Sequence, residues 1–213
     1  LIHGGKGGDF APQAKTILNK AQSELQIGQA KGLLGQRHIT DAENKFKEIV
    51  AKDKGRAPEL QGYLDEIQTY KQNDKEAKKK MDSANKLRSA SNVEDQWSAL
   101  QLYDEVAEGD VSSYTVEARE KRDALRPSLR EKLLAKIKNA SQLKTISSDS
   151  LKEAATCARI LRQAQMEMDD GEKRLARALE LKWLKQDAVK LSALGRWEEA
   201  AQKWQELEDS YPT

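Results

Sequence analysis

Alanine residues recur in pairs along this chain, and the recurrence narrows the possible folds more than any other feature. The first alanine of each pair opens an Ala-x-x-Leu step. The second precedes a large or apolar residue by four positions and an apolar residue by seven. Residues three and four apart share one face of a helix. The pairs are Ala30 and Ala42, Ala84 and Ala99, Ala140 and Ala154, and Ala188 and Ala200, with offsets of 12, 15, 14 and 12 residues.

Such a nearly constant offset is what a helical hairpin needs, because small side chains let two helix backbones approach closely. The sequence therefore predicts four antiparallel helical hairpins. The alternative interpretation is that a chain rich in Ala and Leu produces these matches by chance.

Composition favours an all-α fold for the 213 residues. Aromatic residues make up only 5 % of the chain and charged residues 34 %. A β-sandwich or barrel needs more aromatic and β-branched residues, and a doubly wound α/β fold needs buried Val and Ile runs. The net charge of +2 argues against a dedicated nucleic-acid binder. No apolar run reaches the ~18–20 residues of a membrane span, so we expect no membrane insertion.

The first alanines lie 54, 56 and 48 residues apart, and the extra length falls in three stretches. They contain two prolines, Pro58 in the first turn of its stretch and Pro127 in the interior of the second. These stretches, 57–90, 113–146 and 172–194, are predicted to be long helices that run into the first helix of the next hairpin. Pro127 is expected to kink or divide the second of them. The predicted architecture alternates long and short helices, either as an extended right-handed array or as a compact bundle.

Helix ends carry signals of their own. Thr40 with Glu43, and Ser150 with Glu153, are predicted capping boxes at the starts of short helices. Left-handed glycines are expected just past the ends of the short helices, at Gly55, Gly109 and Gly171.

The last hairpin resembles a tetratricopeptide repeat. Its positions that match the family's pattern are Leu184, Ala188, Leu191, Gly195 at the turn, Ala200, Trp204 and Pro212. The first hairpin is similar at Ala30, Leu33, Ala42, Phe46 and Ile49. The chain departs from the family in length, since that repeat is close to 34 residues. The resemblance implies a concave groove, lined by the first helices, that binds an extended peptide or a partner helix.

By the same resemblance, five polar side chains point toward this groove: Lys31, Asn85, Arg88, Lys144 and Lys185. Their basic and amide character would suit an acidic segment or a free carboxylate. The alternative is that they form the solvated side of their helices. Trp197 follows the turn and is expected to be partly exposed, as an interface residue would be.

Candidates for chemistry are few, so we expect no enzyme, no cofactor and no metal. His3 and His38 lie far apart and are interpreted as surface residues, because a metal site needs three or four convergent ligands. Cys157 is interpreted as a buried apolar residue, since a reactive thiol needs a His or Lys partner. The basic run from Arg119 to Lys138 is interleaved with acidic residues and is predicted to be a salt-bridged helix. A phosphate-tracking groove is the alternative.

The expected organisation is a flexible linker, 1–10, followed by a helical-repeat domain, 11–213. Its units are approximately 11–55, 56–110, 111–170 and 171–213. The sequence predicts a non-catalytic protein–protein interaction or scaffold module, part of a larger protein, that binds a peptide or helix of a partner. The alternatives are an accessory domain of a signalling or membrane-anchored enzyme and a secreted helical effector. Nucleic acid is an unlikely partner, homo-oligomers are compatible with long helices, and a cytoplasmic location is favoured.

Overall fold

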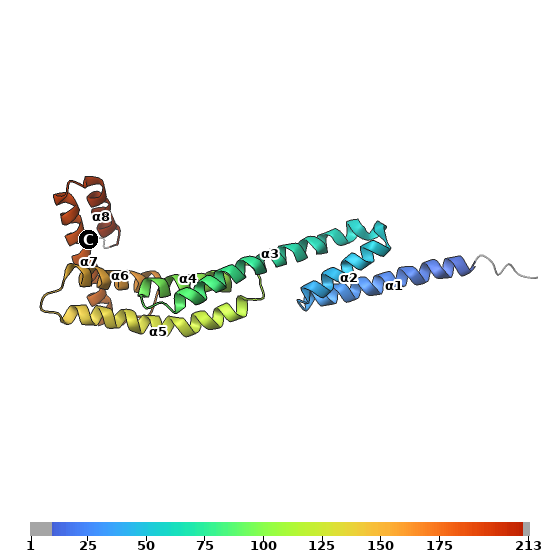
Figure 1. Cartoon of the computed structure of the whole chain (residues 1–213), viewed down its shortest axis with the longest axis horizontal. Helices are drawn as coiled ribbons and strands as arrows, with labels where there is room; N and C mark the ends of the chain where they lie inside the picture. Colours follow the sequence, from blue (N-terminus) through green and yellow to red (C-terminus); the bar gives the residue numbers. More distant parts are fainter. Residues whose placement is uncertain (1–9, 211–213) are drawn as a thin grey trace, which may run out of the picture. The chain divides into compact units, whose positions relative to one another are not determined.

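The computed structural model describes residues 10–210 and the side chains of 12–209, and this part of the chain contains helices and no strands. Figure 1 shows their succession. The helices are α1 (Phe10–Gly35), α2 (Ile39–Lys52), a 3-10 turn (Lys54–Arg56), α3 (Ala57–Arg88), α4 (Val93–Glu108), α5 (Thr115–Gln142), α6 (Ser148–Gln163), α7 (Asp170–Ala193) and α8 (Trp197–Ser210). The prediction of an all-α fold is confirmed.

Long and short helices alternate as the alanine spacing predicts. The three predicted long stretches correspond to α3, α5 and α7, and the four short helices are α2, α4, α6 and α8. The expectation was that Pro127 kinks or divides its helix; α5 passes through Pro127 without a break, so the proline does not divide it. The residue four positions before Pro127, Asp123, is exposed, and its carbonyl is the one that loses an N–H partner at the proline.

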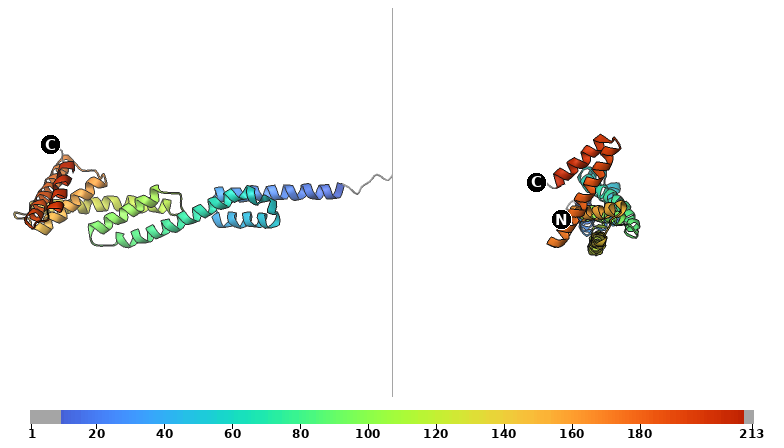
Figure 2. Two further views of the ribbon diagram at one scale, coloured as in Figure 1. Left: turned by 90° about the horizontal axis from the view of Figure 1, so that it is seen from above. Right: turned by 90° about the vertical axis from the view of Figure 1, so that its left-hand side faces the viewer.

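The chain forms two compact units, the first ending at Glu76 and the second beginning at Ala77. Helix α3 contributes residues to both. In the first unit α1 and α2 lie side by side (Figure 2). Their core with α3 is built around Ile27, Phe46, Leu60 and Ile67. The Phe46 and Tyr63 rings stack with centroids 5.3 Å apart.

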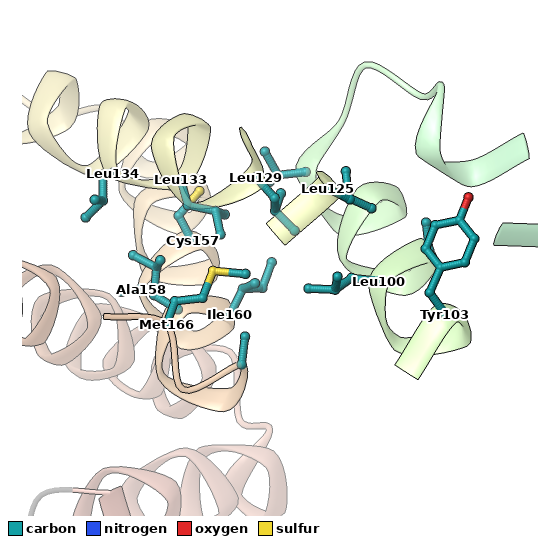
Figure 3. Close-up of a cluster of buried hydrophobic side chains, with 14 of the residues drawn as sticks. Leu100, Tyr103, Leu125, Leu129, Leu133, Leu134, Cys157, Ala158, Ile160 and Met166 are labelled. Carbon is teal, nitrogen blue, oxygen red and sulfur yellow. The ribbon is translucent and has the colours of Figure 1, made fainter. Parts of the chain in front are cut away.

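The second unit has its core along α5. Leu125, Leu129 and Leu133 project from this helix toward side chains of α4 and α6 (Figure 3). Cys157 on α6 is fully buried in this cluster, as the sequence predicted. Each short helix of this unit also packs on its neighbours: α4 on α5, α6 on α5 and α7, and α8 on α7.

All eight alanines of the recurring pairs are buried, none being more than 5 % exposed. Three of the four hairpins, α1–α2, α5–α6 and α7–α8, pack as helix pairs. The fourth is joined by contacts between α3 and α4, where Lys80 and Glu105 form an ion pair of 2.8 Å. The alanines therefore lie on the packed faces of their helices.

Both capping boxes were predicted at the wrong residues. Helix α2 starts after His38, whose carbonyl accepts from the Ala42 N–H at 2.9 Å, so Thr40 lies inside the helix. Helix α6 is capped by the Ser147 hydroxyl, which accepts from the backbone N–H of Ser150 at 3.1 Å. In both cases an earlier residue starts the first turn, and the predicted cap becomes a helical position. A capping box is present at the start of α7, between Asp169 and Glu172.

The glycines Gly55, Gly109 and Gly171 do not have left-handed backbones, which corrects the second prediction on helix ends. Left-handed residues instead occupy two hairpin turns, at Arg37 with φ 63° and Gly195 with φ 72°, and the connection between α6 and α7, at Gln165 with φ 49°. The short helices α2 and α4 end in extended residues, Asp53 and Gly109, which do not need a positive φ. Only Gly195 matches the turn glycine that the resemblance implied.

Among the described helices, none combines the length and the apolar character needed to cross a bilayer. The predicted linker, apart from Phe10, lies outside the described residues, as do His3 and Pro212.

Candidate protein-binding surface

The basic run of α5 is committed to contacts within the chain. All eight of its Lys and Arg side chains bond to carboxylates, an amide or a carbonyl. They are Arg119, Lys121, Arg122, Arg126, Arg130, Lys132, Lys136 and Lys138. Most of these bonds reach other helices, so α5 holds its neighbours in the second unit through hydrogen bonds and ion pairs. The prediction of a salt-bridged helix is confirmed.

Three buried carboxylates lie at helix contacts, and each has a cation beside it. In the first unit Glu43 accepts from Lys47 at 2.9 Å and also from Lys71. These hydrogen bonds, opposed by desolvation, lower the pKa of Glu43 to about 2. In the second unit Lys138 bonds Glu172 at 3.0 Å and holds its pKa below the ordinary value. Glu180 lies 2.8 Å from Arg162. These carboxylates hold helices together rather than forming an acid–base pair in a cleft.

Two of the six predicted binding residues have partners within the chain. Asn85 accepts from the Tyr103 hydroxyl at 2.7 Å and from the Lys121 ammonium at 2.9 Å, and thereby joins α3, α4 and α5. The Lys31 ammonium lies 4.8 Å from the centre of the Tyr63 ring. Its pKa is raised, mainly by a hydrogen bond to that tyrosine.

The other four predicted residues are exposed. Arg88 is the last residue of α3, and Lys185 lies on α7. Lys144 lies beyond the end of α5, in the loop before α6, so it does not occupy the helical groove position that the resemblance gave it. Trp197 is 68 % exposed. Between the described residues no hydrogen bond, ion pair or ring contact joins any two of the six.

The most exposed aromatic surface lies on the last hairpin. Trp197 begins α8, and Trp204 follows two helical turns later on the same side. Trp204, one of the positions that match the family's pattern, is 42 % exposed. Ala201 is exposed between the two indoles. We call Trp197, Ala201 and Trp204 the α8 face.

Other features of the same hairpin reinforce this surface. Leu194, in the turn, is 62 % exposed, and Val189 on α7 is 59 % exposed. Helix α8 is acidic, with one cation, Lys203, against five carboxylates: Glu198, Glu199, Glu206, Glu208 and Asp209. Arg196, just before the helix, donates to Glu199 from two guanidinium nitrogens, Nε and Nη2. The α8 face is therefore apolar and aromatic on a negatively charged helix.

Sequence analysis identified Trp197 but missed Trp204. The signal was present, because Trp197, Ala201 and Trp204 form a second apolar stripe beside the one through Ala200 and Leu207. A helix with two apolar stripes has one left for a second neighbour.

Residues with reactive side chains lie elsewhere. Cys157 is buried, and desolvation raises the pKa of its thiol to about 12. His38 is exposed at the N-terminus of α2. No group of three or more His, Cys, Asp or Glu residues that could hold a metal ion is found in the described part of the chain.

No known protein family, curated protein or solved structure matches this chain. Its surface geometry is therefore the basis for assigning a function.

Proposed function

We propose that this chain is a non-catalytic protein–protein interaction module of tetratricopeptide-like hairpins, and that a helix of a partner protein docks on the α8 face. The observation that carries the proposal is the pair of exposed indoles on one side of a single helix. Tryptophan is among the residues that most often dominate binding energy at protein interfaces. Exposing two on one helix costs hydrophobic free energy that an occupied surface would recover.

The packing order of the second unit supports a helical partner. Helix α4 packs against the long helix that follows it, α5, and α6 packs against α7. Helix α8 packs on α7, and the described residues leave its two indoles exposed. A partner helix on α8 would repeat the arrangement that α5 and α7 provide for the earlier short helices.

The charge of α8 indicates the chemistry of that partner. Five carboxylates against one lysine on the helix favour a partner whose apolar ridge is flanked by Lys or Arg. The ridge would need apolar residues three and four positions apart to cover two indoles spaced by seven residues.

A selection from a phage-displayed library of amphipathic helical peptides tests the proposal. We expect binders enriched in apolar i, i+3 and i+4 residues with basic flanks, and their affinity should fall at least tenfold for Trp197→Ala and Trp204→Ala. Trp197→Ala should keep the thermal stability of the parent to within about 0.5 kcal/mol, because its side chain is largely exposed. Trp204 is 42 % exposed, so Trp204→Ala should cost more, and circular dichroism checks that this variant stays folded.

Val116→Ala is the matched control, since Val116 is 65 % exposed on α5 and lies outside the α8 face. Selected peptides that bind the doubly substituted protein as tightly as the parent would reject the α8 face as the interface.

A further inference from the structure

The side of α1 that faces away from its own core is a second packing surface. It belongs to the first unit, whereas the α8 face belongs to the second. We propose that this side of α1 binds the same side of α1 in a second copy of the chain, with the two helices antiparallel. We call it the α1 face and define it by residues at alternating steps of four and three. They are Ala14, Leu18, Ala21, Leu25, Gly28, Gly32 and Gly35.

The α1 face is exposed along its whole length, although it is built from apolar residues. All seven of its residues are exposed, with Leu18 57 % and Leu25 64 % exposed, and the neighbouring Ile17 is 69 % exposed. At roughly 3.6 residues per turn, these side chains lie opposite Ile27 and Ala30, which are buried in the core of the first unit. Helix α1 therefore has one apolar stripe packed within the chain and one that is left for another neighbour.

The glycines of the α1 face favour a helix as that neighbour. Gly28 and Gly32 lie inside α1, where glycine is less favourable than alanine. A Cβ at either position would meet nothing within 4 Å, so packing among the described residues does not require glycine there. Because residues four apart share a face, the two glycines form a strip without side chains that a second helix can approach closely.

A second copy of α1 supplies side chains that fit this strip. In an antiparallel pair with its two-fold axis between Gln26 and Ile27, Leu25 faces Gly28 of the second copy, and Gly28 faces that copy's Leu25. The other layers are Leu18 with Gly35 and Ala21 with Gly32. Every layer then combines one glycine with one larger residue, so the two helices interdigitate. A parallel pair would place leucine against leucine and glycine against glycine, which leaves gaps.

The residues that flank the α1 face are complementary in the same arrangement. Glu24 faces Lys31 of the second copy along one edge, and the amides of Gln22 and Gln29 face each other along the other edge. Oε1 of Glu24 already accepts from Arg56 at 2.6 Å, and Lys31 contacts a ring of its own chain. A carboxylate and an ammonium can each bond more than one group, so the pairing adds to these contacts and replaces none of them.

An anionic bilayer is the alternative occupant, because α1 carries three lysines against one glutamate among its described residues. Helices that lie on membranes insert large apolar side chains into the lipid. Five of the seven residues of the α1 face are Ala or Gly, and these bury little apolar area in a bilayer. The composition therefore favours a second helix, and vesicle binding is one outcome of the test.

Sedimentation equilibrium of the intact chain measures self-association directly. The layers from Leu18 to Gly35 span about 26 Å of helix. We expect a reversible monomer–dimer equilibrium with a Kd of about 10–500 µM, as for a small interface. In NMR spectra the amide signals of Gly28 and Gly32 should shift with concentration. The signal of Gly62, which lies on α3 in the same unit, should not shift.

Substitution of the glycines separates an interface role from a structural one. Gly28→Gln and Gly32→Gln place a bulky polar side chain on the α1 face, and each should weaken dimerisation at least about tenfold. Neither should lower the thermal stability of the monomer, because glutamine is a better helix former than glycine. Gly62→Gln is the matched control, since Gly62 is an exposed helical glycine whose Cβ also meets no neighbour. It should change the Kd less than about twofold.

A pair of charges tests the antiparallel arrangement. Gln22→Lys combined with Gln29→Glu places opposite charges across one edge of an antiparallel pair, so dimerisation should become about threefold tighter or more. Gln29→Glu also keeps an acceptor for Lys45, which donates to the Gln29 side chain at 3.1 Å. In a parallel pair the new carboxylate would face Glu24 of the second copy and would weaken dimerisation.

Several results would overturn the proposal. They are a chain that stays monomeric up to about 1 mM, equal effects of Gly28→Gln and Gly62→Gln, weaker dimerisation of the Gln22→Lys, Gln29→Glu chain, and binding to anionic vesicles without self-association. Dimerisation lost in Trp197→Ala but kept in Gly28→Gln would place the contact on the α8 face instead. We expect Trp197→Ala to leave dimerisation unchanged and Gly28→Gln to leave the peptide selection on the α8 face unchanged, so the two proposals fail independently.

Discussion

The hydroxyl of Tyr103 donates a hydrogen bond of 2.7 Å to Oδ1 of Asn85, and the tyrosine ring is fully buried. Because Asn85 also accepts from Lys121, one amide oxygen connects three helices. Removing the acceptor should leave a buried hydroxyl unpaired, so Asn85→Ala is expected to lower the free energy of unfolding by about 1–3 kcal/mol. Tyr103→Phe should cost less, about 1 kcal/mol, because the acceptor keeps Lys121.

Urea unfolding followed by tryptophan fluorescence measures this, since all four tryptophans lie in the second unit. If Asn85→Ala kept the stability of the parent but lost binding to a partner, Asn85 would be a binding residue and not a structural one.

The first unit should lose stability in acid through Glu43. Its pKa is about 2 in the folded chain against 4.5 as an ordinary value. The ionised form is therefore stabilised by folding, and its contribution is complete above about pH 5 and disappears as the pH falls toward 2. Glu43→Gln should lower stability at pH 7 and flatten the dependence on pH between 5 and 2.

Urea titrations followed by the NMR amide signals of α2 would report this transition without interference from the second unit. Glu48→Gln is the control, because Glu48 is exposed on the same helix. If the free energy of unfolding fell equally between pH 5 and pH 2 in Glu43→Gln and in the parent, Glu43 would not be the source of the acid sensitivity.

Cys157 should resist modification in the folded protein. Burial raises the pKa of its thiol to about 12, so at pH 8 the reactive thiolate is both scarce and covered. Iodoacetamide should label it only at the rate at which the second unit opens, and urea should accelerate labelling. Cys157→Ser should cost about 1–3 kcal/mol through an unpaired hydroxyl. Fast labelling with unchanged circular dichroism would mean that the thiol is accessible.

The same substitution at two glycines should have opposite effects. A Cβ at Gly62, inside α3, meets nothing within 4 Å, so Gly62→Ala should raise stability by about 0.5–1 kcal/mol through helix propensity. Gly195 has φ 72°, where Ala is strained, and Gly195→Ala should lower stability by about 1–2 kcal/mol. Thermal unfolding of the two variants measures both; equal signs would refute the backbone argument.

The sequence was sufficient for the helices but not for their ends. Helix positions follow from apolar periodicity, which local side-chain spacing controls, so α3, α5 and α7 were predicted within a few residues. The ends depend on which of several competing residues starts the first turn. Ser147 and Ser150 both have capping chemistry, and their neighbours do not show which one begins α6.

The binding surface was harder to predict because exposure depends on the neighbouring helices. Asn85 was placed on a groove, yet it is enclosed by Lys121, 36 residues away in sequence. Trp204 matches the repeat pattern of the last hairpin, yet α8 packs on α7 and leaves the indole 42 % exposed. No local sequence pattern predicts the contact between Asn85 and Lys121 or the exposure of Trp204.

The eight buried alanines have a consequence for evolution. At these positions any added methylene must displace an opposing helix, whereas the surrounding leucines can exchange for isoleucine or methionine with repacking. A distant homologue is therefore expected to keep small volumes at these eight sites after its loops, charges and aromatic residues have diverged. Homologues should therefore be easier to detect by small residues at these eight sites than by overall sequence identity.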